Sequence, residues 1–240
     1  MSTKSDVADN PVMACRNSPS VLHRGDCRIS AILFDADGVV IDSEKIWDSA
    51  QATFSRRHGI PYEREKTKPL MAGRSQAEAI EILRKQYGLV GDTRSLANER
   101  MELVKREFAK GVEFVPGFLE FFQQICADYQ TCIATSMPEE LLVVVDARLK
   151  LSALFGGRIF SLIAVGHRSK PHPDLFLHAA NQLGVEPANC LVIEDAPNGV
   201  EAARRAGMKC IALTTTFGRE TLQHADRIVN SFAQIDLTRI

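Results

Sequence analysis

A short apolar run, residues 29–34, is followed at once by two carboxylates, Asp35 and Asp37, and then by a glycine. A run this short and apolar predicts a β-strand that is buried on both faces. Residues two apart on a strand point to the same side, so the two carboxylates would project together, about 6.6 Å apart. Like charges this close repel each other unless a cation or a proton lies between them. The alternative is an ordinary turn, because Asp and Gly are common turn residues.

The rest of the chain adds a second constraint. From about residue 112 onward, short apolar runs alternate with amphipathic helical patterns, which is typical of βαβ units and predicts a parallel sheet. Further strands are expected at Thr131–Thr135, Ile159–Val165, Cys190–Glu194 and Lys209–Leu213, with a short edge strand at Arg227–Val229. Helices are expected near residues 117–128, 138–150, 173–184 and 198–206.

Residues 44–111, between the first strand and this alternating region, have apolar residues at helical spacing and no convincing strand. We therefore predict an α/β core, formed by residues 29–43 and 112–240, with an inserted all-α segment. Trp47 falls among the apolar positions of this segment, so its expected place is the core between the helices. Residues 1–28 are polar and lack the apolar stretch of a secretory signal, so we expect a loosely ordered extension.

The composition of the chain argues against nucleic acid and membranes as its binding partners. A formal net charge of −1 provides no basic surface for nucleic acid or for an anionic membrane. No apolar stretch approaches the roughly 20 residues that a membrane-spanning helix needs. The six cysteines form no C-x-x-C pair and four lie in apolar segments, which favours free thiols in a reduced, cytoplasmic setting. We expect a monomer that acts on a small molecule.

Polar side chains follow the predicted strands where each strand ends, and ligands of open parallel sheets bind at that edge. Each of these side chains has an ordinary interpretation as a helix cap, a solvated cation or a turn residue. Their occurrence at four strand ends of one predicted sheet favours a single site. The candidates are Asp35 and Asp37, then Thr135 and Ser136, then Lys170, and finally Glu194 and Asp195.

The order of these motifs resembles that of the haloacid dehalogenase superfamily. The branch it resembles has a helical cap after the first strand and includes the beta-phosphoglucomutase-like and sugar-phosphate phosphatases. The matching motifs are D-x-D-G-V at residues 35–39, Thr135 at a strand end, K-P-x-P-D at residues 170–174, and an acidic pair that leads to Gly199. The resemblance covers about residues 29–230. It implies a Rossmann-like parallel-sheet core with helices on both faces and an all-α cap.

The resemblance also implies an activity, a Mg²⁺-dependent phosphatase for a small phosphorylated metabolite of the sugar or sugar-acid phosphate kind. Asp35 would attack phosphorus and form an aspartyl-phosphate, which divides one difficult step into two. Asp37 would protonate the leaving oxygen and then deprotonate the attacking water. Mg²⁺ prefers oxygen ligands, and it would be held by Asp35, the main-chain carbonyl of Asp37 and Asp195, with Glu194 nearby.

The remaining candidates would bind the charged parts of the substrate. By the same resemblance, Lys170 would offset the charge of the nucleophile and of the phosphoryl group, while Thr135 and Ser136 would hydrogen-bond phosphoryl oxygens. Arg74 follows a glycine in the helical segment, so it could pair with a second anionic group of the substrate.

Two alternatives stay open. Phosphomutase relatives place an arginine where this chain has Gln76 and a histidine where it has Trp47, so both departures weaken a mutase assignment. Phospho-accepting signalling modules also use carboxylates, a hydroxyl and a lysine at strand ends with Mg²⁺. They normally lack an insert of this size, and their accepting aspartate follows the third strand. A dehalogenase is disfavoured, because its chemistry does not use the carboxylate that Asp37 supplies here.

Overall fold

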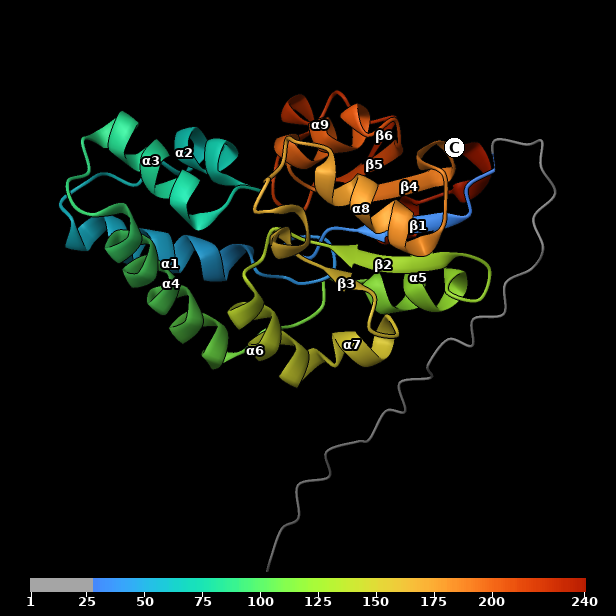
Figure 1. Ribbon diagram of the computed structural model, residues 1–240, viewed down its shortest axis with the longest axis horizontal. Helices are drawn as coiled ribbons and strands as arrows, with labels where there is room; N and C mark the ends of the chain where they lie inside the picture. Colours follow the sequence, from blue (N-terminus) through green and yellow to red (C-terminus); the bar gives the residue numbers. More distant parts are fainter. Residues whose placement is uncertain (1–27) are drawn as a thin grey trace, which may run out of the picture.

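The computed structural model describes residues 28–240, so the prediction for residues 1–28 lies almost wholly outside the described residues. The described part contains a sheet of six parallel strands in the order β3-β2-β1-β4-β5-β6, with helices above and below it (Figure 1). The predicted α/β fold is confirmed. The strands are β1 (Ala31–Phe34), β2 (Gln130–Ala134), β3 (Ile159–Phe160), β4 (Cys190–Glu194), β5 (Lys209–Leu213) and β6 (Arg227–Val229).

The helices fall into two groups along the chain. Four of them lie between β1 and β2: α1 (Glu44–Arg57), α2 (Arg64–Met71), α3 (Gln76–Tyr87) and α4 (Thr93–Lys110). The others are α5 (Phe118–Ile125), α6 (Glu139–Leu149), α7 (Leu151–Leu154), α8 (Asp174–Leu183) and α9 (Pro197–Arg205).

Strand β1 lies at the centre of the sheet, and none of its four side chains is exposed. It pairs in parallel with β2 on one side and with β4 on the other. Because successive side chains of a strand point to opposite faces, Ile32 and Phe34 pack in one core and Ala31 and Leu33 in the other. Helices α5, α6 and α7 supply residues to the first core, and α8 and α9 to the second. A strand covered on both faces explains why the run reads as continuously apolar.

Aromatic side chains fill much of the core below β1. Phe34 makes edge-on contacts with Phe118 at 5.7 Å and with Phe155 at 5.8 Å between ring centroids. Phe118 also contacts Phe122 at 5.6 Å and Phe232 at 5.7 Å. Contacts of this geometry add stability beyond the area that the rings bury. The cluster therefore fixes α5 and the C-terminal segment against the central strand.

Helices α1 to α4 lie together beside the strand ends, at the left of Figure 1. Two of these helices begin at side-chain caps. Ser75 and Glu78 form a reciprocal capping box at the start of α3, and Asp92 accepts a hydrogen bond from the main-chain N–H of Ser95 at the start of α4. Such caps satisfy main-chain donors that the first turn leaves unpaired. The caps therefore fix where α3 and α4 begin.

The strand prediction at Ile159–Val165 was wrong beyond Phe160. Strand β3 has only two residues, and a 3-10 helix follows at Leu162–Val165. The reason lies in its neighbour, because β3 is an edge strand that pairs with Ile133 and Ala134 at the end of β2. Past Ala134 no partner strand continues the ladder, so the chain turns into a helix. The predicted edge strand Arg227–Val229 is present as β6.

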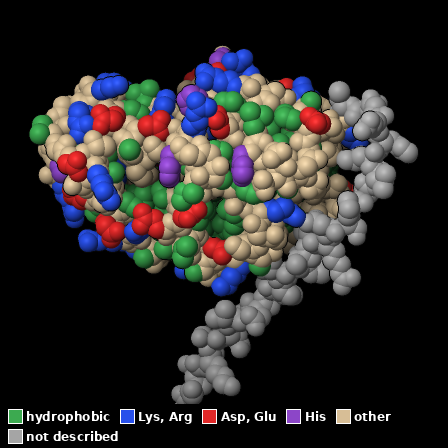
Figure 2. Space-filling view, in the orientation of Figure 1, with side chains coloured by type: hydrophobic (Ala, Val, Ile, Leu, Met, Phe, Trp, Pro, Cys, Tyr) green, Lys and Arg blue, Asp and Glu red, His purple; other side chains and the backbone are tan. Residues whose placement is uncertain are grey.

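Two further observations concern the surface and the cysteines. Within residues 28–240, no helix combines the length and the apolar character that crossing a bilayer requires. On the face shown in Figure 2, acidic and basic side chains are interspersed. Cys132, Cys190 and Cys210 are buried free thiols, as predicted for apolar segments. The same prediction was wrong for Cys126, which is disulfide-bonded.

We predict that Phe118→Ala lowers the free energy of unfolding by about 3–5 kcal/mol, because it removes a buried ring from the aromatic cluster. Urea denaturation measures the change. Val143→Ala is the control, since Val143 is 68% exposed on α6 and its truncation is expected to change stability by less than about 0.5 kcal/mol. Equal effects of the two substitutions would contradict the importance of the cluster.

Candidate active site

Three buried carboxylates meet at the carboxyl ends of β1 and β4. Asp35 follows β1, Glu194 is the last residue of β4, and Asp195 follows it. Each offers an oxygen atom, and these atoms lie within 4.8 Å of one another. Since β1 and β4 are adjacent and in register, with Phe34 opposite Ile193, the strand ends bring the carboxylates together. The sequence placed all three at this edge, and the structure brings them together.

Lys170 lies among these carboxylates. Its ammonium donates hydrogen bonds to the carboxylate of Asp35 and to Oε1 of Glu194, the second at 2.7 Å. The side chain is 1% exposed, and the ammonium also lies 4.8 Å from the centre of the Phe176 ring. The lysine thus supplies one positive charge to a site with three carboxylates.

The pKa values of Asp35, Asp195 and Lys170 are shifted by burial and by this excess of carboxylates. Burial raises the pKa of Asp35 to about 7, although the charge of Lys170 opposes the rise. Burial raises the pKa of Asp195 well above its usual value, and the charges of Glu194 and Asp35 raise it further. Burial would lower the pKa of Lys170, but Asp35 and Glu194 raise it above its ordinary value. The lysine therefore stays protonated, whereas Asp35 and Asp195 keep their protons to higher pH than ordinary carboxyl groups, because neighbouring negative charges and burial disfavour their ionised forms.

The donor set suits a divalent cation. Carboxylate oxygens are the ligands that hard cations such as Mg²⁺ prefer, and the carboxylate cluster presents three residues of this kind in a buried position. Glu194 is already held on both oxygens, because Oε1 accepts from Lys170 and Oε2 accepts from the main-chain N–H groups of Asp195 and Ala196, at 2.8 and 2.9 Å. The cluster could bind a metal ion, with Asp35 and Asp195 the carboxylates less committed to protein donors.

Two glycines make room for these side chains. A Cβ atom on Gly38 would lie 1.8 Å from Oδ2 of Asp195, and the φ angle of Gly38 is +71°. A Cβ atom on Gly199, at the start of α9, would lie 1.7 Å from Oε1 of Glu194. Only glycine allows the main chain to come this close to the carboxylates.

Asp37 is oriented differently from the other acidic residues. Its Oδ1 accepts a hydrogen bond from Oγ of Ser43 at 2.5 Å and another from Nε1 of Trp47 at 2.7 Å. Burial raises the pKa of Asp37, and these two hydrogen bonds oppose the rise. Trp47 was expected only in the helical core, yet its indole N–H reaches the site. The available signal was that a buried tryptophan needs an acceptor for this N–H.

The two hydroxyl residues after β2 have different partners. Thr135 is fully buried, and its Oγ1 accepts from the main-chain N–H of Met137 at 3.0 Å. Ser136 lines the cavity above the carboxylates, and its Oγ donates to the main-chain carbonyl of Gly73 at 2.7 Å. Ser136 therefore links the strand end to the helical segment, residues 44–111.

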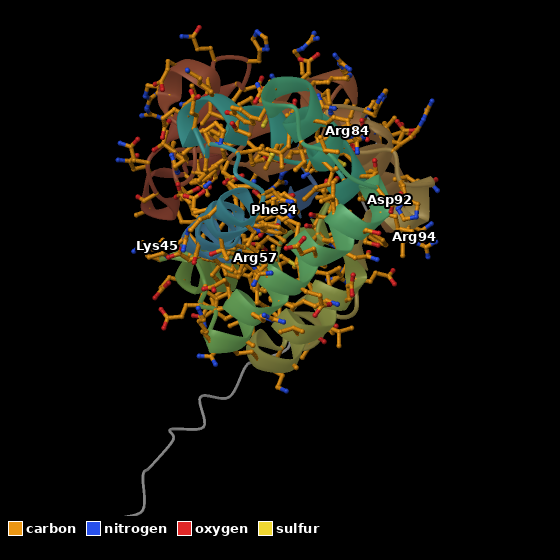
Figure 3. The ribbon with its side chains drawn as sticks, turned by 90° about the vertical axis from the view of Figure 1, so that its left-hand side faces the viewer. Lys45, Phe54, Arg57, Arg84, Asp92 and Arg94 are labelled. Atoms are coloured by element: carbon orange, nitrogen blue, oxygen red, sulfur yellow. The ribbon has the colours of Figure 1, made fainter. Side chains whose placement is uncertain are left out.

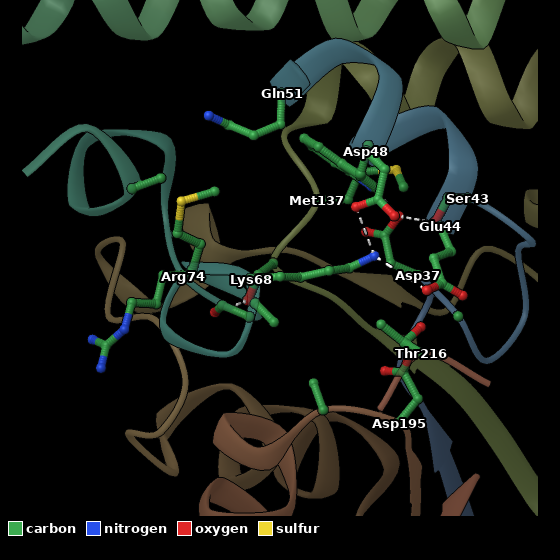
Figure 4. A pocket seen from close by; sticks show the side chains of 18 of the residues that line it. Asp37, Ser43, Glu44, Asp48, Gln51, Lys68, Arg74, Met137, Asp195 and Thr216 are labelled. Atoms are coloured by element: carbon green, nitrogen blue, oxygen red, sulfur yellow. Dashed lines mark hydrogen bonds and ion pairs between the residues drawn. The ribbon is translucent and has the colours of Figure 1, made fainter. Parts of the chain in front are cut away.

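The structure does not bring the guanidinium of Arg74 together with the carboxylates. Its Nε donates to the main-chain carbonyl of Leu70 at 2.9 Å, and its Nη1 lies 3.4 Å from Oε1 of Glu78. Figure 4 shows the guanidinium pointing away from Asp37 and Asp195. The residue lines the cavity, but its charge is directed elsewhere.

Other polar side chains of the helical segment face the same cavity, and sequence reasoning missed them. Lys68 extends across it towards Asp48 and Asp37 (Figure 4), with its ammonium 3.0 Å from Oδ1 of Asp48 and 3.4 Å from Glu44. A single sequence gives no signal for such residues, because they resemble ordinary polar positions on helices. The polar residues of this wall are Glu44, Asp48, Gln51, Tyr62, Lys68, Gln76 and Arg100.

Hydrogen bonds join the helical segment to the core around the cavity. Asn198 Nδ2 donates to the main-chain carbonyl of Ala72 at 2.8 Å, and Ser169 Oγ donates to Oε2 of Glu78 at 2.5 Å. With the contact from Ser136, these bonds hold the segment over the carboxylates. The arrangement forms a cavity with the three buried carboxylates, a candidate metal site, at its base.

Comparison with known proteins agrees with this geometry. A family model described as haloacid dehalogenase-like hydrolase matches residues 29–207. Hexitol phosphatase A of Escherichia coli (strain K12) is 31% identical over 88% of this chain and 95% of its own length. The 6-phosphogluconate phosphatase of the same strain is 28% identical, covering 76% of this chain and 81% of its own.

Solved structures show the same fold. A hydrolase from Pseudomonas syringae superimposes with a TM-score of 0.75 at 25% identity, covering 85% of this chain and 94% of that one. A putative beta-phosphoglucomutase from Bacteroides vulgatus gives a TM-score of 0.71 at 27% identity, covering 86% and 85% of the two chains.

We predict that Lys170→Met lowers the free energy of unfolding by about 3–5 kcal/mol, because it leaves buried carboxylates without their cation. Urea denaturation in EDTA measures this loss, and added Mg²⁺ should recover part of it by binding the folded state. Lys209→Met is the matched control, since Lys209 forms an exposed ion pair with Asp226 that contributes little. A variant at position 170 as stable as the wild type would refute the charge-balancing role.

Proposed function

This chain belongs to the haloacid dehalogenase-like hydrolases and is a phosphatase of that family, and we propose that it is a Mg²⁺-dependent enzyme for a small phosphorylated metabolite. The observation that carries the proposal is the enclosed cavity with Lys170 among three buried carboxylates and Asp37 beside them. The names of two relatives refer to hexitols and to 6-phosphogluconate, which supports a sugar phosphate or sugar-acid phosphate as substrate.

In the proposed mechanism Asp35 is the nucleophile. One of its oxygens bonds to phosphorus while the bond to the leaving oxygen breaks, and Asp37 gives that oxygen a proton. Water then attacks the aspartyl-phosphate and loses a proton to Asp37, so phosphate leaves and both residues return to their first state. The hydrogen bonds from Ser43 and Trp47 hold the Asp37 carboxyl group in place for both steps.

The remaining residues of the site would balance negative charge or bind the phosphoryl group. Lys170 offsets the charge of Asp35, which lets a phosphoryl group approach the buried carboxylates. Asp35, Asp195 and the main-chain carbonyl of Asp37 would hold Mg²⁺, which neutralises phosphoryl oxygens when bound. Glu194 would fix Lys170 rather than ligate, because both its oxygens already accept hydrogen bonds. Thr135, whose Oγ1 accepts from Met137, would donate its hydroxyl hydrogen to a phosphoryl oxygen, and Ser136 would do the same after releasing the carbonyl of Gly73.

We further propose that residues 44–111 act as a cap that excludes water and selects the substrate, above a core of residues 29–43 and 112–240. The polar wall and the hydrogen bonds across the cavity support this division. The monomeric state and the cytoplasmic setting stay predictions.

We predict Mg²⁺-dependent phosphate release from a panel of sugar phosphates and sugar-acid phosphates, and its loss in EDTA. Asp35→Asn should lower kcat by roughly 10³-fold or more, because the amide is a poor nucleophile of nearly the same shape. Asp128→Asn, which changes an exposed carboxylate before β2, is the matched control and should keep full activity.

Activity near wild type in Asp35→Asn would refute the nucleophile. Isomerised product in the presence of a sugar bisphosphate, without net phosphate release, would favour the mutase instead.

We predict that Trp47→Phe lowers kcat about 10–100-fold on alkyl phosphates such as sugar phosphates, because Asp37 loses a charge-assisted hydrogen bond that positions it. p-Nitrophenyl phosphate should be much less affected, since its leaving group needs no proton. Tyr87→Phe is the control, because it removes a hydrogen bond to Thr67 in the same helical segment, outside the cavity. Equal losses on both substrates would contradict a role of Trp47 in protonation of the leaving group and would place the defect in the later attack of water or in the fold.

A further inference from the structure

Arg100, on α4, is a buried cation in the wall of the cavity. Arg100 is only 5% exposed, and it lines the same cavity as the carboxylates. Its Nε donates to Oε1 of Gln51 at 2.7 Å, and a second nitrogen donates to Oε1 of Gln76. The guanidinium also lies 5.4 Å from the centre of the Trp47 ring. All of these partners are neutral.

The other cations of the cavity have ionic partners. Lys68 is paired with Asp48 and Arg74 with Glu78, and Lys170, behind the carboxylates, is paired with Asp35 and Glu194. Within residues 28–240, no carboxylate lies at ion-pair distance from Arg100. Burial lowers the pKa of Arg100 to about 10, so the group keeps its charge at neutral pH. The cavity wall therefore carries one positive charge that the protein does not neutralise.

A buried charge without a counter-ion is unfavourable, and amide oxygens compensate it only in part. Such a group is expected where a ligand supplies the missing charge. Gln51 and Gln76 fix the guanidinium plane from two sides, which is the preorganisation that recognition of a planar anion requires. A single charge matches a monoanion such as a carboxylate.

We propose that Arg100, oriented by Gln51 and Gln76, binds a carboxylate of the substrate, so that the preferred substrates are phosphorylated sugar acids and not phosphorylated polyols or neutral sugars. The inference rests on the proposed phosphatase activity for its turnover, but the recognition itself is a binding property. It assigns to Arg100 the second-anion role that the sequence suggested for Arg74, whose guanidinium pairs with Glu78 and points away from the carboxylates.

The experiment compares two pairs of substrates that differ only in the group concerned. Gluconate 6-phosphate and glucitol 6-phosphate have the same chain and phosphate, with a carboxylate in one and a hydroxymethyl group in the other. 3-Phosphoglycerate and glycerol 3-phosphate form a shorter pair. In the wild type, kcat/KM should be at least about tenfold higher for the acid than for the alcohol, in whichever pair the enzyme turns over faster. The difference should lie chiefly in KM. A ratio near one, or a preference for the alcohol, would overturn the proposal.

Variants test whether Arg100 carries the preference. Arg100→Met, which keeps the length and removes the charge, should lower the acid-to-alcohol ratio about tenfold or more. Arg100→Lys keeps the charge without the planar donors, so it should retain part of the ratio, and it serves if the methionine variant does not fold. Arg94→Met, at the exposed start of the same helix and at the edge of the molecule in Figure 3, should leave the ratio unchanged. Equal loss on acid and alcohol in the Arg100 variants would show a structural role only.

p-Nitrophenyl phosphate separates failure of this inference from failure of the proposed function. Its hydrolysis together with a ratio near one would leave the phosphatase standing and overturn the carboxylate site. Absence of turnover on every substrate would refute the proposed function. Calorimetric binding of the gluconate and glucitol phosphates to wild type and Arg100→Met would then decide the inference. Tighter binding of the acid, lost in the variant, would support it, and equal binding would overturn it.

Discussion

The burial of negative charge at the ends of two adjacent strands is the constraint on which the rest of the structure depends. Asp35, Glu194 and Asp195 are held within a few ångströms because β1 and β4 are paired in register. Lys170 makes this arrangement tolerable, since its ammonium bridges the two strands. The main chain adds its own compensation through two N–H groups that donate to Glu194. A polar site of this density can persist in a core only when its members satisfy one another.

The same constraint explains the division of labour along the chain. The strand ends provide a fixed set of charges, and their positions follow from a sheet that is packed on both faces. The helical segment instead provides a wall whose polar residues come from four helices, with Asp48 on α1, Lys68 on α2, Gln76 on α3 and Arg100 on α4. Residues of the wall can change without disturbing the sheet, whereas Gly38 and Gly199 have no freedom beside the carboxylates. The proposed chemistry and the proposed substrate selection therefore lie in different parts of the fold.

The sequence allowed the fold and the strand-end residues to be predicted, because both depend on local patterns. Alternating apolar runs locate the strands, and parallel topology places the residues after them at one edge. The features that could not be predicted depend on contacts between residues far apart in the sequence or on which side-chain partners lie within reach. Strand β3 ends early because its neighbour ends, and Arg74 turns away because the carbonyl of Leu70 and the carboxylate of Glu78 are within its reach. Arg100 could not be singled out, since its importance comes from lacking a carboxylate partner in a buried position.

Trp47 connects the two parts of the cavity. Its indole N–H donates to Asp37, and the guanidinium of Arg100 lies over its ring. Phe108 packs edge-on against the same ring at 6.1 Å and so fixes its orientation from α4. The side chain that positions the proposed acid and base is therefore held by the helix that carries the proposed recognition residue. Because α1 and α4 pack along each other, a displacement of either helix would move the indole relative to Asp37. Correct placement of the helical segment over the sheet is thus a condition for the proposed proton transfer as well as for the proposed substrate choice.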